Sequence, residues 1–334
     1  MRNRSRITLM VVAIATWAAC AGCDRLTTQA LRDGGLDSVA SLWEQLDAGT
    51  VNYNAVAGSS PDNVFIVGDQ GTILHWDGIA LSPEESGTTT NLRGVSVVNA
   101  TLAYAVGEQG TILHRQDGVW STDPPMNTAV LNATYAASAF AVAVGEQGTI
   151  LICRQGVWSQ VPNSRTENYY AVANANDGLQ VVGALGVVVR VDPGAGTIIN
   201  TVSIQGYTKV LAGAVPYASG SLFVGVDGGV FYWANGVATS EPNLPKNSPP
   251  EDFPPQRFLR AVSVVGSTVW IVGHEGLVVT GTLDAPMTLV PTPDERWLLG
   301  VYAASATDVW VVGRSGLIMR GPPGARSPFD GGAP

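Results

Sequence analysis

Charged residues are scarce in this sequence: only 13% of its 334 residues are Asp, Glu, Lys or Arg. A chain with so little charge and 46% hydrophobic residues lacks the composition of a disordered protein. Glycine is abundant instead, with 39 residues, and glycine serves the tight, positive-φ turns of β proteins. The composition therefore favours an all-β fold over a disordered or helical chain.

Basic residues are outnumbered by acidic ones, 18 against 27. Arg2, Arg4 and Arg6 fall in a leader-like segment, and without these three the balance is 15 against 27, a net charge near −12. A surface of that sign repels phosphate backbones, so we expect no nucleic-acid partner. The same sign disfavours direct adsorption to anionic lipid.

Residues 1–22 are expected to be a lipoprotein signal peptide. The basic segment MRNRSR precedes the apolar stretch ITLMVVAIATWAA, which is shorter than the roughly 20 residues of a membrane-spanning helix. The sequence Cys20-Ala21-Gly22-Cys23 then resembles a bacterial lipobox with Cys23 as the acylated residue, and an ordinary cleaved signal peptide is the alternative. Residues 23–40 would form a flexible tether, which predicts a membrane-anchored protein of the bacterial cell envelope, periplasmic or on the outer-membrane surface.

Residues with catalytic or metal-binding chemistry are few. The histidines are His75, His114 and His274, of which the first two occupy equivalent positions of a repeat. Cys153 lies in the apolar segment ILICR, which predicts a small buried side chain. No EF-hand loop, phosphate-binding glycine loop or nucleophile elbow occurs. We expect no cofactor, no metal, no catalytic residue and, once Cys20 has left with the leader, no disulfide.

One short sequence motif occurs seven times: an apolar run, Gly, two variable residues, Gly and a second apolar run. The clearest copies are VFIVGDQGTILHW (64–76), AYAVGEQGTILH (103–114) and AVAVGEQGTILI (141–152). The first glycines of the seven copies are Gly68, Gly107, Gly145, Gly183, Gly225, Gly273 and Gly313. Their spacings are 39, 38, 38, 42, 48 and 40 residues. A period near 40 built from short β segments indicates a β-propeller with one four-stranded blade per repeat.

Strand counting at the two ends predicts how the ring closes. The last repeat supplies strands at 298–305, 309–313 and 316–320 and lacks an outer one, whereas segment 41–46 is an orphan strand before the first repeat. Trp43 of that segment aligns with the outer-strand residues Trp120 and Trp158. We therefore predict an all-β, seven-bladed β-propeller of four-stranded antiparallel blades over residues 41–320, in which the N-terminal strand completes the last blade. The Gly- and Pro-rich residues 321–334 are expected to be a disordered tail.

The residue pairs between the two glycines are expected around one mouth of the central channel. Five of the seven pairs carry a carboxylate: Asp69, Glu108, Glu146, Asp227 and Glu275. Clustered carboxylates suit a cation, an amine or a basic protein segment, and the alternative is that polar residues simply suit exposed turns. The candidate binding rim comprises Asp69, Gln70, Glu108, Gln109, Glu146, Gln147, Asp227, His274, Glu275 and Arg314.

Departures from the repeat on this face are informative, because turn chemistry does not require them. The fourth repeat has Ala184-Leu185 and the seventh has Arg314-Ser315. The longest step contains a Pro-rich insertion, 241–257, which either borders the mouth and docks a partner or is a tolerated surface loop.

The unit VG(D/E)QGTIL…DG.W resembles the repeats of photosystem II stability/assembly-factor-like propellers, a group within the BNR/Asp-box-like and sortilin-like propellers. The resemblance covers roughly residues 41–320 and is strongest in the first three repeats. It implies a lipoprotein that helps to build membrane complexes.

These observations predict a non-enzymatic, monomeric, lipid-anchored propeller that binds an envelope protein or a glycan. One alternative is an extracellular glycan-processing hydrolase or lyase of the sialidase-like type, and another is a structural spacer. Such an enzyme needs an arginine cluster near the axis, for which the inner-strand residues Arg93 and Arg260 are the candidates.

Overall fold

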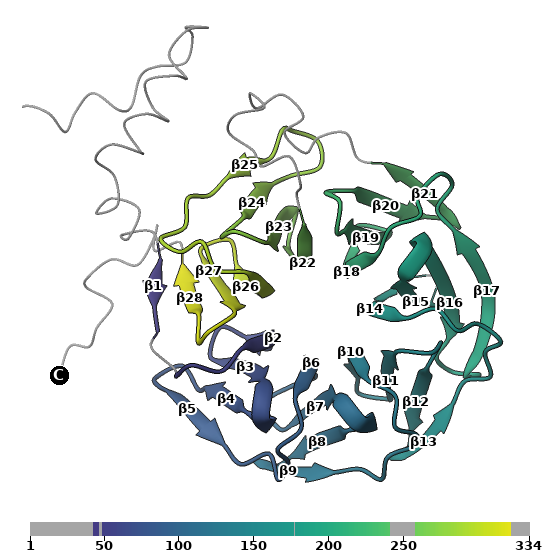
Figure 1. The fold of residues 1–334 in the computed structure, drawn as a ribbon, viewed down its shortest axis with the longest axis horizontal. Helices are drawn as coiled ribbons and strands as arrows, with labels where there is room; N and C mark the ends of the chain where they lie inside the picture. Colours follow the sequence, from purple (N-terminus) through teal and green to yellow (C-terminus); the bar gives the residue numbers. More distant parts are fainter. Residues whose placement is uncertain (1–42, 47–48, 177, 241–257, 322–334) are drawn as a thin grey trace, which may run out of the picture.

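The computed structural model describes residues 43–46, 49–176, 178–240 and 258–321. Within these ranges, seven four-stranded antiparallel sheets are arranged as blades around a central axis, which confirms the predicted fold (Figure 1). The signal peptide, Cys23, the tether, the 241–257 insertion and the tail beyond Gly321 lie outside the described residues. No helix in the described part of the chain is long and apolar enough to cross a membrane.

Blades 1 to 7 follow the order of the seven repeats, and each runs from an inner strand beside the axis to an outer strand at the rim. The inner strands are β2 (Tyr53–Ser60), β6 (Leu92–Val97), β10 (Leu131–Ala137), β14 (Tyr169–Ala175), β18 (Leu211–Tyr217), β22 (Leu259–Val265) and β26 (Leu298–Ser305). The second strands are β3 (Asn63–Gly68), β7 (Leu102–Gly107), β11 (Phe140–Gly145), β15 (Gly178–Gly183), β19 (Gly220–Gly225), β23 (Thr268–Gly273) and β27 (Asp308–Gly313).

The third strands are β4 (Ile73–Trp76), β8 (Ile112–Gln116), β12 (Ile150–Arg154), β16 (Val187–Asp192), β20 (Val230–Ala234), β24 (Val278–Gly281) and β28 (Ile318–Gly321). The outer strands are β5 (Leu81–Glu84), β9 (Val119–Thr122), β13 (Val157–Gln160), β17 (Thr197–Ser203), β21 (Val237–Ser240), β25 (Thr288–Leu289) and, for blade 7, β1 (Glu44–Gln45). Three short 3-10 turns join second to third strands: η1 (Asp69–Gly71), η2 (Glu108–Gly110) and η3 (Ala184–Gly186).

The inner strands carry a small residue where neighbouring blades approach one another at the axis. A Cβ atom added to Gly94 of β6 would lie 2.9 Å from the Cα atom of Ala133 in β10. At Gly300 of β26 the added atom would lie 3.2 Å from the Cα atom of Ala55 in β2. Convergence of the blades therefore restricts this position to Gly or Ala.

The second strands form the core between adjacent sheets. Phe65 and Trp310 are fully buried, and Trp270 is nearly so. Phe65 packs with Leu92 and Trp120 of the next blade, so each such aromatic side chain fills the space where two sheets diverge. The described cysteine, Cys153, is buried and free, and burial raises the pKa of its thiol.

The outer-strand tryptophans link each blade to the one before it. The indole Nε1 of Trp120 donates to Glu84 at 2.7 Å, and that of Trp158 donates to Asp123 at 2.8 Å. Each acceptor carboxylate also contacts a histidine of its own blade, His75 Nδ1 at 3.0 Å from Glu84 and His114 Nδ1 at 2.8 Å from Asp123. These two histidines are therefore structural parts of the repeat.

The ring closes through the N-terminal strand, as predicted. β1 pairs with β28 in antiparallel fashion, with Glu44 opposite Arg320. The indole of Trp43 donates to the carbonyl of Pro291 at 3.0 Å, so Trp43 links blade 7 to blade 6 in the manner of the other outer-strand tryptophans. The pairing covers the outer edge of β28 and gives blade 7 the same four strands as the other blades.

Candidate functional site

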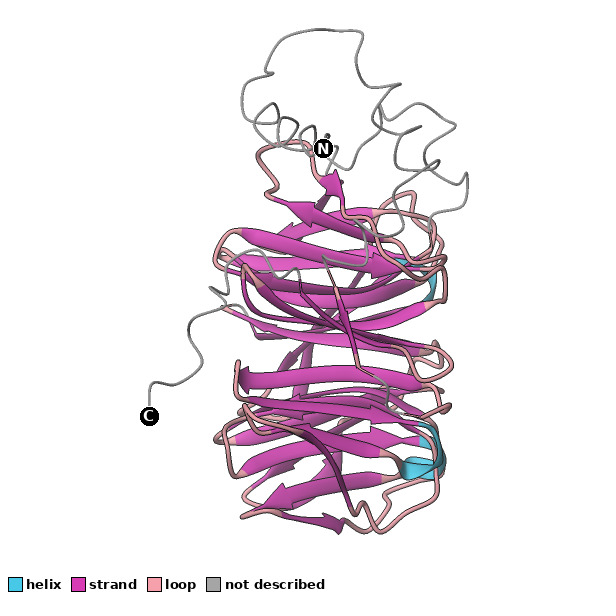
Figure 2. Cartoon of the chain, turned by 90° about the vertical axis from the view of Figure 1, so that its left-hand side faces the viewer, coloured by secondary structure: helices cyan, strands magenta, loops and turns pink. Residues whose placement is uncertain are grey.

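All seven turns between second and third strands lie beside the connections that join one blade to the next. The backbone N–H of the first turn residue donates to the connection in every blade, for example Asp69 to Asn52 O, His274 to Phe258 O and Arg314 to Trp297 O. Figure 2 shows the short helical turns on one face of the disc. We call this face the mouth face, and the sequence-predicted rim residues lie on it.

The second turn residue adopts left-handed backbone in six blades. Gln70, Gln109, Gln147, Leu185, Glu275 and Ser315 have φ between 54° and 59°. Polar side chains tolerate this conformation, but Leu185 places an apolar side chain there that is 55% exposed. Neither the turn nor the core explains Leu185.

Two of the rim carboxylates hold the turns in place. Asn52 Nδ2 donates to Asp69 Oδ2 at 2.7 Å, which leaves Asn52 Oδ1 to accept the backbone N–H of Ser315 in blade 7 at 3.0 Å. Asn91 makes the same two contacts one blade further on. Its Nδ2 donates to Glu108 at 3.2 Å, and its Oδ1 accepts the backbone N–H of Gln70 in blade 1 at 2.9 Å. The carboxylates of Asp69 and Glu108 thus orient asparagines that bridge neighbouring blades.

Replacing Asp69 with Ala is expected to destabilise the protein, because Asn52 and Asn54 both donate to this carboxylate. Losing the acceptor should cost about 1–2 kcal/mol, measured as a shift in thermal unfolding. Glu146→Ala is the matched control, since no described residue donates to the Glu146 carboxylate. Equal destabilisation of the two variants would contradict the bridging role.

The remaining carboxylates have separate environments. Asp227 accepts the hydroxyl of Tyr207 at 2.7 Å, and burial together with this contact raises the pKa of Tyr207. Glu275 is exposed. Among the described residues, no three His, Cys, Asp or Glu side chains lie close enough together to hold a metal ion.

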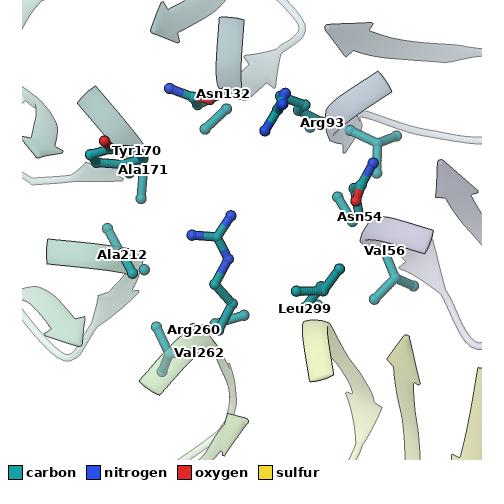
Figure 3. A pocket seen from close by; sticks show the side chains of 18 of the residues that line it. Asn54, Val56, Arg93, Asn132, Tyr170, Ala171, Ala212, Arg260, Val262 and Leu299 are labelled. Carbon is teal, nitrogen blue, oxygen red and sulfur yellow. The ribbon is translucent and has the colours of Figure 1, made fainter. Parts of the chain in front are cut away.

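The channel is lined by a second ring of residues that the sequence analysis did not identify as a set. Each inner strand has a β-bulge that skips its second residue in the pairing with the second strand. The skipped residues are Asn54, Arg93, Asn132, Tyr170, Ala212, Arg260 and Leu299, and all seven line one cavity of about 180 Å³ (Figure 3). Their position directly before the small Gly or Ala residue was the available sequence signal.

Arg260 is the member of this ring that reaches into the centre of the channel (Figure 3). No described residue forms a hydrogen bond or an ion pair with its guanidinium. Arg93, across the channel, donates to Glu108 at 2.6 Å. Burial, and secondarily the charges of Arg93 and Arg314, lower the pKa of Arg260.

A stacked row of side chains borders the channel at blades 6 and 7. His274 stacks on Trp297 with ring centroids 3.6 Å apart, and Phe258 lies on its other side at 4.8 Å. The guanidinium of Arg314 covers Trp297 at 3.8 Å. Burial, followed by the charges of Arg260 and Arg314, lowers the pKa of His274, which favours the uncharged imidazole.

The sign of the charge therefore changes around the mouth face. The first turn residue is an acid in blades 1 to 3 (Asp69, Glu108 and Glu146), apolar in blades 4 and 5 (Ala184 and Val226), and His274 or Arg314 in blades 6 and 7. Three of the five expected rim carboxylates, Asp69, Glu108 and Glu146, lie in blades 1 to 3, whereas Asp227 and Glu275 are the second turn residues of blades 5 and 6. Blades 6 and 7 carry Arg260, Arg314 and exposed aromatic surface of Phe258 and Trp297, together with the exposed Glu275.

Solved structures with the same architecture are similar over most of the chain. YCF48 bound to D1 peptide matches with a TM-score of 0.65 and 15% identity, covering 84% of this chain and 96% of that one. The WD40 propeller domain of Doa1 matches with a TM-score of 0.66 and 12% identity over 83% and 94% of the two chains. The Cps50 (Swd1) propeller domain of Myceliophteria thermophila has a TM-score of 0.63 and 12% identity over 83% and 98%.

At these identities the likeness shows the propeller fold. No protein-family model matches the sequence, and no curated protein is similar to it.

Proposed function

We propose that this chain is a non-enzymatic, protein-binding propeller of the bacterial envelope, anchored by a lipid on Cys23, and that its partner binds across the mouth face. The observation that carries the proposal is the exposed set of Leu185, Phe258, Trp297 and Arg314 on that face. Aromatic, Arg and apolar side chains are typical of protein interfaces. YCF48, a propeller of the same architecture, is itself known bound to a D1 peptide, which supports a peptide or protein as ligand.

Leu185→Asp is expected to weaken capture of the native partner by roughly tenfold, since losing an anchor in an interface costs about 1–2 kcal/mol. Asp tolerates left-handed backbone, so the fold should be unaffected. The experiment uses the full lipidated protein as bait in its native envelope, with quantification of the recovered partners.

Val157→Asp is the matched control. Val157 is 69% exposed and follows the turn between β12 and β13, which lies on the face opposite the mouth. Identical recovery with Leu185→Asp and Val157→Asp would show that the partner does not bind at the mouth face.

One observation favours the glycan-processing alternative: Arg93, Arg260 and Tyr170 line the same cavity. The described residues that line this cavity include no Asp, Glu or His, so a general acid would have to enter from elsewhere. Release of reducing sugar from envelope glycans, abolished by Arg260→Gln, would favour the enzyme over the binding protein.

A further inference from the structure

The centre of the channel holds a cation that the described residues do not compensate. Arg260 extends from the β22 bulge into the cavity, and its guanidinium has no partner there (Figure 3). A guanidinium stays protonated in a protein and carries five N–H donors. Arg260 is half-buried, and taking a charged group even partly out of water without a partner costs free energy, so buried charges are normally paired.

The charged groups nearest to Arg260 do not supply the missing partner. Arg93 and Arg314 are cations, and both repel the positive charge of Arg260, which lowers its pKa. The Glu108 carboxylate is engaged by Arg93 at 2.6 Å and by Asn91 at 3.2 Å. The field in this part of the channel is therefore positive, although the protein as a whole has a net charge of −9.

The cavity has the size and the donors for one small anionic group. Its volume of about 180 Å³ accommodates a carboxylate or a phosphate group with a few waters. Besides Arg260, the ring contributes Arg93, Tyr170 and the N–H of Asn132 that is not donated to the Tyr169 carbonyl, each from a different blade. The amide of Asn54 is not available, because it donates to both Asp69 and the Leu92 carbonyl. A guanidinium can donate two parallel N–H hydrogen bonds to the oxygens of one carboxylate or phosphate group.

We propose that the mouth of the central channel is an oxyanion-binding site in which Arg260 receives one carboxylate or phosphate group. This site differs from the rim carboxylates Asp69, Glu108 and Glu146, which lie in blades 1 to 3. The oxyanion comes either from a free small anion or from an acidic group on the partner of the proposed function, and only the second source rests on that function.

Titration with inorganic phosphate and with acetate at low ionic strength tests the site, with isothermal calorimetry and thermal unfolding as readouts. We expect saturable binding and a rise in the unfolding temperature with ligand concentration, both of which Arg260→Gln reduces at least tenfold. Arg165→Gln is the matched control, because Arg165 is already paired with Glu167 at 2.6 Å. Equal binding by Arg260→Gln and the unsubstituted protein would overturn the proposal.

The stability of the ligand-free protein provides a second test that does not depend on the probe. In low-salt buffer without phosphate, Arg260→Leu should unfold at the same temperature as the unsubstituted protein or higher, because the substitution removes an uncompensated charge. A clear decrease in the unfolding temperature would mean that the protein itself satisfies Arg260, and would also overturn the site.

Competition distinguishes the two sources of the oxyanion. If saturating phosphate displaces the captured partner, the partner supplies the anionic group. If the partner is retained while phosphate remains bound, the oxyanion is a free small anion. Failure to capture any partner would count against the proposed function alone, since phosphate binding by the isolated protein is measured independently.

Discussion

A chain that begins at residue 47 is expected to unfold at a temperature about 10 °C below that of a chain that begins at residue 42. The shorter chain lacks β1, so β28 becomes an exposed strand edge in blade 7. It also lacks Trp43, which is 3% exposed and packs with Trp270 and Met319 between blades 6 and 7. Loss of a buried tryptophan costs about 3–5 kcal/mol, and a domain of this size loses roughly 2–4 °C per kcal/mol.

Thermal unfolding followed by circular dichroism checks this expectation. The chain that begins at residue 42 is the control, because it lacks everything before the closing strand and retains Trp43, Glu44 and Gln45. Coincident transitions for the two chains would show that β1 contributes nothing to closure.

Glu84→Gln is expected to cost about 3–5 kcal/mol of unfolding free energy at neutral pH, the cost of leaving a buried cation unpaired. Glu84 accepts the Arg115 guanidinium through Nε at 2.8 Å and Nη2 at 2.9 Å, and it also accepts the indole of Trp120. The Arg115 side chain is only 9% exposed, so water cannot replace the carboxylate. Glu85→Gln, at the exposed neighbouring position, should leave stability unchanged.

The same carboxylate makes stability depend on pH. Burial opposes ionisation of Glu84, but hydrogen bonds from His75 and Arg115 outweigh it and lower the pKa of Glu84 from 4.5 to about 2. Because the pKa is lowered by folding, the stabilisation is complete above about pH 4.5 and is lost as the pH falls towards 2. Urea unfolding should show the gap between Glu84→Gln and the unsubstituted protein closing over that range. A gap that stays constant would contradict the network.

The sequence repeat was sufficient to predict the propeller fold. A period near 40 with a glycine pair in each copy fixes the number of blades, because every blade needs the same turn. The alignment of Trp43 with Trp120 and Trp158 predicted the closing strand, and the structure shows why: all three indoles donate to the preceding blade.

The channel was much harder to predict. The sequence placed Arg93 and Arg260 on inner strands, but not the β-bulges that direct both residues into one cavity, because that arrangement exists only after the ring has closed. The acidic turns were conspicuous in the sequence, but the asparagines that engage Asp69 and Glu108 come from connections between blades. Leu185, by contrast, is visible in the sequence as a departure from the repeat, and the structure gives no packing or turn reason for it.

Site-specific photo-cross-linking tests most directly the claim that the mouth face binds the partner. A photoreactive amino acid in place of Leu185, on the mouth face, is compared in the native envelope with the same amino acid in place of Val157, on the opposite face. The account predicts a discrete cross-linked product from position 185, reduced by Arg260→Gln if the partner supplies the oxyanion, and none from position 157. A product from position 157 alone would contradict it.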